Sequence, residues 1–218
     1  MGSGVDLMSE YGNYTLDEYR DALASNSPTP GGGTAAAVAL SQGAALALMV
    51  CNLTEGREKW KEGWAAAEIC RGIAEPLLEL GHQLASDDAQ AFDHVMLAYK
   101  MPKNSDEEIE QRKLAIQKHT LNAAMIPMQT ARAAFDLLQT LHSLASTGNS
   151  NAVTDVGVAS LLVSAACKGA LFNVEINISS LSESEEATQL RCELDDLRIK
   201  CRNSARDVMH AVHDRIQS

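Results

Sequence analysis

The sequence predicts an all-α protein, a multihelical up-and-down bundle with long helices. Of its 218 residues, 45% are hydrophobic, but only 4% are aromatic and only 5 are proline. This composition is typical of helices rich in Ala and Leu and not of a many-stranded β protein. Two stretches, 31–50 and 153–171, are almost free of charge, as expected for helices buried on all sides of a bundle. Sequences that resemble helix capping boxes recur along the chain.

The first helix is predicted to begin at Thr15, because Thr15 and Glu18 have the spacing of a capping box. Residues 1–14 are expected to be a tag followed by a disordered N-terminus, since the chain opens with Met-Gly-Ser-Gly. The Pro- and Gly-rich segment 25–33 must break the helix. A second, uncharged helix is then expected from Thr34 to about Thr54.

Further helices follow from the same signals. A third tract runs from about residue 58 to 99, with a bend expected at Pro76. After a loop, Ser105 and Glu108 predict the start of a helix that extends to about residue 145, with a kink at Pro127. The next helix is expected over 153–171, followed by an irregular segment at 172–178.

A final capping box, Ser182 with Glu185, predicts a charged amphipathic helix that reaches about residue 216. We find no internal repeat and no linker, so residues 15–218 are predicted to form a single domain.

The charge balance and the cysteines restrict the function. The net charge of −11 argues against nucleic acid as a partner, because phosphates repel an acidic surface. The 5 cysteines are widely spaced without a Cys-x-x-Cys motif, which favours reduced thiols and a cytoplasmic location. Segment 31–50 has the length of a membrane span, but its many Ala and Gly residues favour a buried bundle helix over a membrane helix.

One carboxylate interrupts an otherwise apolar helix face. Stepping by four and three residues from 77 to 98 gives Leu77, Gly81, Leu84, Asp88, Ala91, Val95 and Ala98. Asp88 is therefore expected on the face that points into the core. Burial raises the pKa of a carboxyl group toward the range useful for proton transfer. A purely structural Asp, hydrogen-bonded to a neighbouring helix, remains the alternative on this pattern alone.

Two loops could also form part of a site. Pro30, Gly31, Gly32 and Gly33 precede a helix, where the backbone can approach a ligand closely. The same residues could simply interrupt the chain between two helices. Around the second uncharged helix lie Asn149, Asn151, Asp155, Asn173 and Asn177. They are either helix caps or groups that bind a polar heterocycle. The six histidines form no metal-binding pattern, so no metal site is predicted.

Taken together, these motifs resemble the formiminotetrahydrofolate cyclodeaminase / methenyltetrahydrofolate cyclohydrolase family. The resemblance covers residues 15 to 217 and rests on segments in the same order. These segments are 27–33, 49–56, 87–92, 101–112, Pro127, 148–155 and 173–177. Segments 49–54 and 99–104 resemble in particular the bacterial cyclohydrolases that consist of this domain alone.

The resemblance implies a homodimeric helical bundle that acts on a tetrahydrofolate derivative without a metal or redox cofactor. The catalytic aspartate of the family falls on Asp88, and the glycine-rich and asparagine-containing segments fall on the folate site. The leading prediction from the resemblance is hydrolysis of 5,10-methenyltetrahydrofolate to 10-formyltetrahydrofolate. The alternative within the family is cyclisation of 5-formiminotetrahydrofolate with loss of ammonia. A folate-binding dimer without catalysis is the third alternative.

An anionic substrate raises a further expectation for two basic residues. Because the chain is acidic, a local cationic cluster is needed to hold a tail of one or several glutamates. Lys103 and Arg112 are the candidates for this role. The alternative is that both are solvated surface charges, with Arg112 paired to Glu108 one turn earlier.

Overall fold

The computed structural model describes residues 11–218, and this part of the chain is helical without any β-strand. The predicted all-α class is therefore confirmed. The helices are α1 (Leu16–Leu23), α2 (Gly32–Thr54), α3 (Trp64–Tyr99), α4 (Asp106–Thr147), α5 (Val153–Ser179) and α6 (Glu185–Gln217). The 3-10 helix η1 (Tyr11–Asn13) precedes α1, η2 (Glu58–Gly63) lies between α2 and α3, and η3 (Ser150–Ala152) lies between α4 and α5.

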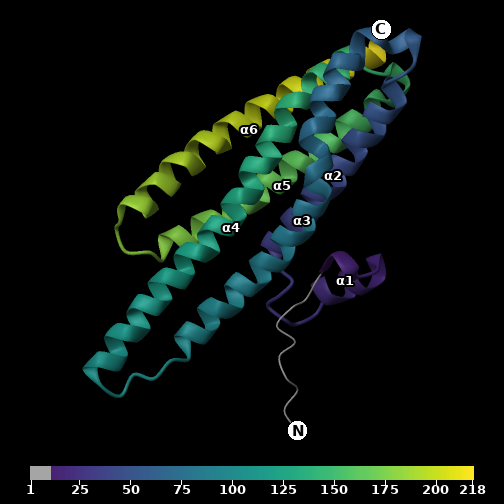
Figure 1. The fold of residues 1–218 in the computed structure, drawn as a ribbon. Helices are drawn as coiled ribbons and strands as arrows, with labels where there is room; N and C mark the ends of the chain where they lie inside the picture. The colour runs from purple at the N-terminus through teal and green to yellow at the C-terminus, as the bar shows by residue number, and fades with distance from the viewer. Residues whose placement is uncertain (1–10) are drawn as a thin grey trace.

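Helices α2 to α6 run up and down along one long axis, while α1 stands beside the start of α2 (Figure 1). Helix α2 packs between α3 and α5, and α4 packs against the same two helices. Helix α6 covers α4 and α5. One large apolar core runs through these five helices, which is why the two uncharged segments lie at its centre.

Small residues bring α2 very close to both of its neighbours. A β-carbon on Gly81 of α3 would lie 2.8 Å from the β-carbon of Ser41. A β-carbon on Gly43 of α2 would lie 2.5 Å from a methyl group of Val163 in α5. No larger side chain fits at either glycine without moving the helices apart.

The predicted helix starts are partly right. At α1 the full capping box is present, because Thr15 Oγ1 accepts from the Glu18 amide (3.2 Å) and Glu18 accepts from the Thr15 amide (2.8 Å). At α4, Ser105 caps the helix, but the Glu108 carboxylate accepts from the amide of Asn104 instead of Ser105. Helix α2 begins at Gly32, two residues before the predicted start.

Two expectations near the C-terminus are wrong. Residues 172–178 continue α5 as regular helix to Ser179, with Val174 and Ile178 buried in the core. Helix α6 is capped by Ser184 and not by Ser182, since Ser184 Oγ accepts from the amide of Ala187. The amide of Ser182 donates instead to Gln117 of α4, which ties this loop to the bundle.

Helical structure is already present before the predicted boundary at residue 15. Residues 11–13 form η1, and Tyr11 is buried against the bundle. The predicted tag residues 1–4 lie outside the described residues. Pro76 and Pro127 lie inside α3 and α4, which continue through both positions.

Two helices are long and apolar enough to cross a membrane, Gly32–Thr54 and Ser150–Ser179. More than half of each is buried inside the bundle, which is the behaviour of core helices. All five cysteines are free thiols, and four of them are buried.

Candidate active site

Asp88 lies on α3 directly beside the start of α2. The Thr34 hydroxyl donates a hydrogen bond of 3.2 Å to Asp88 Oδ2. Next to it, a β-carbon on Gly33 would come within 2.6 Å of the carboxyl carbon of Asp88. Only glycine therefore allows the carboxylate to lie against the first turn of α2. The two features singled out from the sequence, the glycine-rich loop and Asp88, are adjacent in space.

The surroundings of Asp88 change its acidity. Burial raises the pKa of its carboxyl group, and the hydrogen bonds from Thr34 oppose this shift only in part. The protonated and ionised forms are thus closer in free energy than for an exposed aspartate. Such a carboxyl group is suited to accept a proton and to return it.

Tyr19 of α1 is a second polar group near Asp88, and no sequence motif points to it. Burial raises the pKa of Tyr19 to about 12, and the nearby Tyr11 and Asp88 contribute smaller shifts in the same direction. Its ring packs against a small apolar cluster that includes Leu84 and Ala89 on either side of Asp88. Its hydroxyl is buried and has no hydrogen-bond partner within residues 11–218. Helix α1 therefore covers one side of the site.

The end of α5 lies on another side of the loop. A β-carbon on Gly32 would lie 3.8 Å from the Asn173 side-chain nitrogen, so these two residues are neighbours with room between them. Asn173 donates to the carbonyl of Gly169 within α5. Asn177 donates to the carbonyls of Asn173 (2.9 Å) and of Ala123 in α4 (2.8 Å). The two amides thus fix the end of α5 beside the loop.

Asn149, Asn151 and Asp155 lie at the other end of the bundle. Asn149 is buried and donates to the carbonyl of Leu53, at the C-terminus of α2. Its own side-chain oxygen accepts from the amide of Asn151. The 20 residues from Thr34 to Thr54 correspond to about 30 Å of helix. Within one chain, these three residues are therefore remote from Asp88.

Lys103 and Arg112 lie at the turn between α3 and α4, beyond Asp88. The guanidinium of Arg112 donates to the carbonyl of Tyr99 (3.1 and 3.3 Å) and lies 5.7 Å from the centre of its ring. The alternative pairing of Arg112 with Glu108 is not what holds it in place. Lys103 is exposed in the loop.

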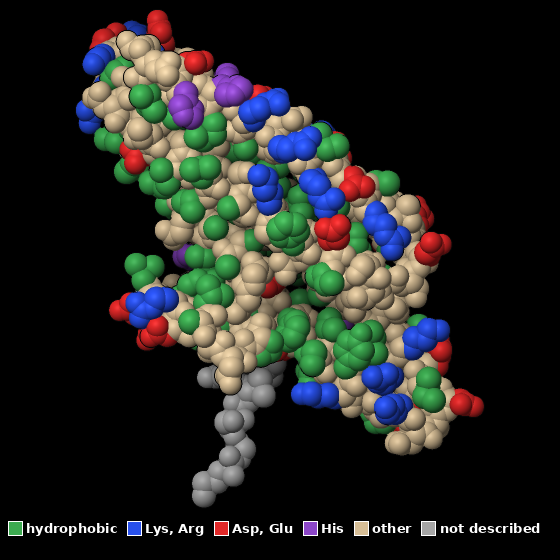
Figure 2. Space-filling model, turned by 180° about the vertical axis from the view of Figure 1, so that it is seen from behind, with side chains coloured by type: hydrophobic (Ala, Val, Ile, Leu, Met, Phe, Trp, Pro, Cys, Tyr) green, Lys and Arg blue, Asp and Glu red, His purple; other side chains and the backbone are tan. Residues whose placement is uncertain are grey.

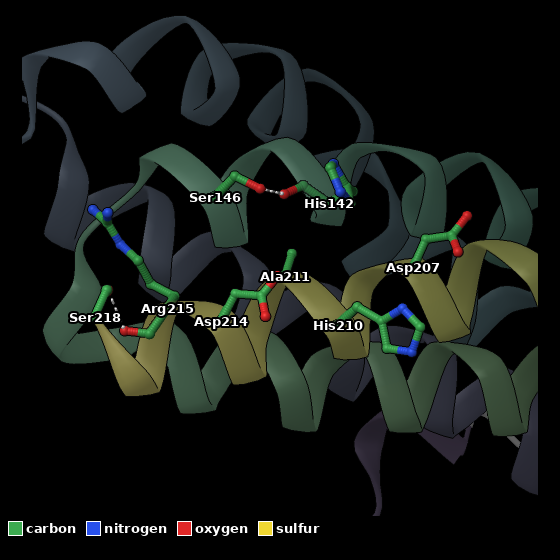
Figure 3. A pocket seen from close by; sticks show the side chains of 8 residues that line it. All are labelled: His142, Ser146, Asp207, His210, Ala211, Asp214, Arg215 and Ser218. Carbon is green, nitrogen blue, oxygen red and sulfur yellow. Dashed lines mark hydrogen bonds between the residues drawn. The ribbon is translucent and has the colours of Figure 1, made fainter.

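A polar surface pocket lies elsewhere, between the ends of α4 and α6 (Figure 3). His142 on α4 and Asp207, His210 and Asp214 on α6 line it. Neither these side chains nor any others among residues 11–218 form a cluster that could hold a metal ion. Arg215 in this pocket donates to the carbonyl of Gly148, which belongs to the end remote from Asp88. The pocket is therefore separate from the candidate site.

Two known enzymes and one solved structure are similar to this chain. The chain is 39% identical to a methenyltetrahydrofolate cyclohydrolase of Methylorubrum extorquens over 85% of its length and 89% of the relative. It is 33% identical to the formimidoyltransferase-cyclodeaminase of Gallus gallus, of which it spans 32%. A crystal structure of a formiminotetrahydrofolate cyclodeaminase from Thermotoga maritima is similar, with a TM-score of 0.83 and 29% identity. The structural match covers 94% of this chain and 98% of the Thermotoga chain.

A family model described as formiminotransferase-cyclodeaminase matches residues 15–196. The match includes the glycine-rich loop, Asp88 and the asparagines of α5, so the resemblance seen in the sequence is confirmed. The chain belongs to the formiminotransferase-cyclodeaminase family.

Proposed function

We propose that this protein is a methenyltetrahydrofolate cyclohydrolase, which hydrolyses 5,10-methenyltetrahydrofolate to 10-formyltetrahydrofolate. The observation that carries the proposal is the half-buried carboxylate of Asp88 against the first turn of α2. The similarity to the Methylorubrum cyclohydrolase over most of both chains supports the choice of reaction. A cytoplasmic location is part of the same proposal.

The proposed chemistry uses Asp88 to move a proton. Water attacks the carbon that joins N5 and N10, and the Asp88 carboxylate accepts a proton from it. The bond from this carbon to N5 then breaks, and N5 takes the electron pair and the proton that Asp88 returns. The hydroxyl proton is released as the carbonyl forms, so the formyl group remains on N10. Every step is a proton transfer or a bond change at one carbon, and none requires a cofactor.

The cyclodeaminase reaction is the second candidate, favoured by the similarity to the Thermotoga structure along nearly the whole chain. There N10 attacks the formimino carbon on N5, and ammonia leaves. Asp88 could move the protons of this reaction in the same way.

An absorbance assay distinguishes the candidates. The protein is mixed with 5,10-methenyltetrahydrofolate or with 5-formiminotetrahydrofolate, and the methenyl absorbance is followed. Loss of absorbance above the uncatalysed rate supports the cyclohydrolase, and a gain from the formimino compound supports the cyclodeaminase. No change with either substrate would contradict both and support a folate-binding dimer without catalysis.

A homodimer is proposed from an uncharged surface on α2 and α5, which we call the α2–α5 face. On α2 it carries Gln42, Ala45 and Met49, and on α5 Val158 and Leu161; all five are exposed. No charged residue occurs in α2, and the side of the molecule drawn in Figure 2 has hydrophobic side chains gathered beside a row of Lys and Arg. A stripe of this kind is typical of a surface that packs on a second copy.

The dimer would also explain why some candidate residues lie far from Asp88 within one chain. If the two copies of α2 run antiparallel across the face, the end with Asn149, Asn151 and Asp155 in one protomer lies beside the Asp88 end of its partner. The residues that the resemblance assigns to one folate site then meet between two chains. This arrangement is part of the proposal.

Ala45→Glu is expected to convert a dimer to a monomer, because two carboxylates would be buried at the centre of the α2–α5 face. Analytical ultracentrifugation measures the mass, and Ala65→Glu, at an exposed alanine of α3, is the matched control. A monomeric wild type, or a dimer that persists in Ala45→Glu, would contradict the proposed interface.

Lys103→Ala is expected to weaken the binding of polyglutamylated folate about tenfold and that of the monoglutamate much less. Lys103 is exposed at the α3–α4 turn, where its charge can attract additional carboxylates. Added salt should shrink the difference, because screening weakens exposed charge pairs. Equal changes in Kd for both ligands would show that Lys103 is only a solvated charge.

A further inference from the structure

The side of α3 that carries Asp88 continues beyond it as an apolar stripe. Phe92, Val95 and Tyr99 follow Asp88 by four, seven and eleven residues, so all four side chains share one side of the helix. The mean rise of a helix places Tyr99 about 16 Å from Asp88 along α3. The stripe therefore leads from the candidate catalytic carboxylate to the α3–α4 turn.

This stripe is uncovered because α2 begins beside Asp88. On the same side of α3 before Asp88, Leu77 and Leu84 are 6% and 1% exposed, since α2 packs on them. After Asp88, Phe92 is 37% and Tyr99 is 48% exposed. Hydrophobic side chains gather here beside a hollow, between the main body and the lobe that ends in the α3–α4 turn (Figure 2). Two large aromatic side chains are thus left in contact with solvent next to the site.

The far end of the stripe is cationic. Arg112 is held against Tyr99 by hydrogen bonds to its carbonyl and by contact with its ring. Lys103 lies in the adjoining loop. From Asp88 toward the α3–α4 turn, the surface thus presents a carboxylate, then exposed aromatic rings, and finally the positive charges of Lys103 and Arg112.

We propose that this stripe binds the aminobenzoyl-glutamate arm of the folate, with its benzoyl ring on Phe92. The inference rests on the proposed function, in which Asp88 acts on the carbon between N5 and N10. The benzoyl ring is bonded to N10, so it must lie next to that carbon, and the glutamate carboxylates lie beyond the ring. The ligand thus has the same order of a reacting centre, a flat apolar ring and negative charges.

Phe92 contributes binding and not chemistry in this arrangement. Its ring offers a flat surface on which the benzoyl ring can stack in an offset or edge-to-face geometry. Because this contact is the same before and after the reaction, its loss should raise KM and leave kcat almost unchanged. Phe92 is therefore a residue that selects for the arm of the substrate.

The test compares Phe92→Ala with Leu97→Ala, a control at a more exposed side chain on the opposite side of α3. We expect Phe92→Ala to raise KM for methenyltetrahydrofolate about tenfold with kcat within a factor of two. Phe92→Tyr should restore the wild-type KM, and circular dichroism should show the same helix content throughout. Equal KM values for Phe92→Ala and Leu97→Ala would overturn the proposal.

A fragment of the substrate provides a second measurement. Free p-aminobenzoylglutamate is expected to bind the wild-type protein in calorimetry and to bind Phe92→Ala about tenfold more weakly. No binding to the wild type, or equal binding to both, would overturn the proposal. If the wild type does not turn over methenyltetrahydrofolate, the proposed function fails, and the fragment measurement still decides whether the stripe binds the arm.

Discussion

Asp88→Asn is expected to lower kcat by a factor of about a hundred or more, because the amide cannot accept the proton that Asp88 takes from water. The amide has the size of the carboxyl group, so the contacts with Gly33 and Thr34 should remain. Turnover of methenyltetrahydrofolate measures the loss, and circular dichroism verifies the fold. A variant with near-normal kcat would remove Asp88 from the mechanism.

The pH dependence provides an independent check on Asp88. Since burial raises the pKa of its carboxyl group, wild-type activity should fall with decreasing pH above the range where an exposed aspartate titrates. The same shift means that the ionised form is destabilised in the folded protein. Asp88→Asn should therefore raise Tm slightly at neutral pH, and this gain should shrink as the pH falls and Asp88 becomes protonated.

Gly33→Ala is the second substitution with a large expected effect. The new β-carbon would lie 2.6 Å from the carboxyl carbon of Asp88, so either the carboxylate or the first turn of α2 must move. We expect kcat to fall at least about tenfold, because misplacing a reacting group by about an ångström is costly. Turnover of methenyltetrahydrofolate is again the measurement.

Gly72→Ala is the control for this substitution, because a β-carbon at Gly72 of α3 meets no other atom within 4 Å. It should leave kcat unchanged and stabilise the helix slightly, as alanine does in exposed helix interiors. A Gly33→Ala variant with the kcat of Gly72→Ala would mean that the close approach of α2 to Asp88 has no catalytic importance.

The sequence predicted the helical class and the family, and the resemblance implied that the glycine-rich loop and Asp88 belong to one site. Asp88 breaks an apolar face of α3, and that face must lie against another helix. Other features depend on contacts between distant segments and left no local pattern. The hydrogen bond from Thr34, the approach of Tyr19 from α1 and the distance of Asn149 from Asp88 all follow from how the helices pack.

The errors at helix ends have a similar cause. Ser182 and Glu185 have the spacing of a capping box, but the amide of Ser182 binds Gln117 of α4, and the helix begins after Ser184. The sequence predicts an irregular segment at 172–178, whereas Val174 and Ile178 pack in the core and α5 continues as helix to Ser179. In both cases a tertiary contact outweighs a local preference.

The close contacts of α2 with α3 at Gly81 and with α5 at Gly43 make the stability of the candidate site depend on the packing of the whole bundle. A side chain larger than glycine at either position would collide with the neighbouring helix, so α2 lies very close to α3 and α5 there. Because the first turn of α2 forms one wall around Asp88, the spacing within the site is set by contacts along the length of the helix. We therefore expect thermal inactivation to follow global unfolding closely, because the wall beside Asp88 belongs to a helix of the central core.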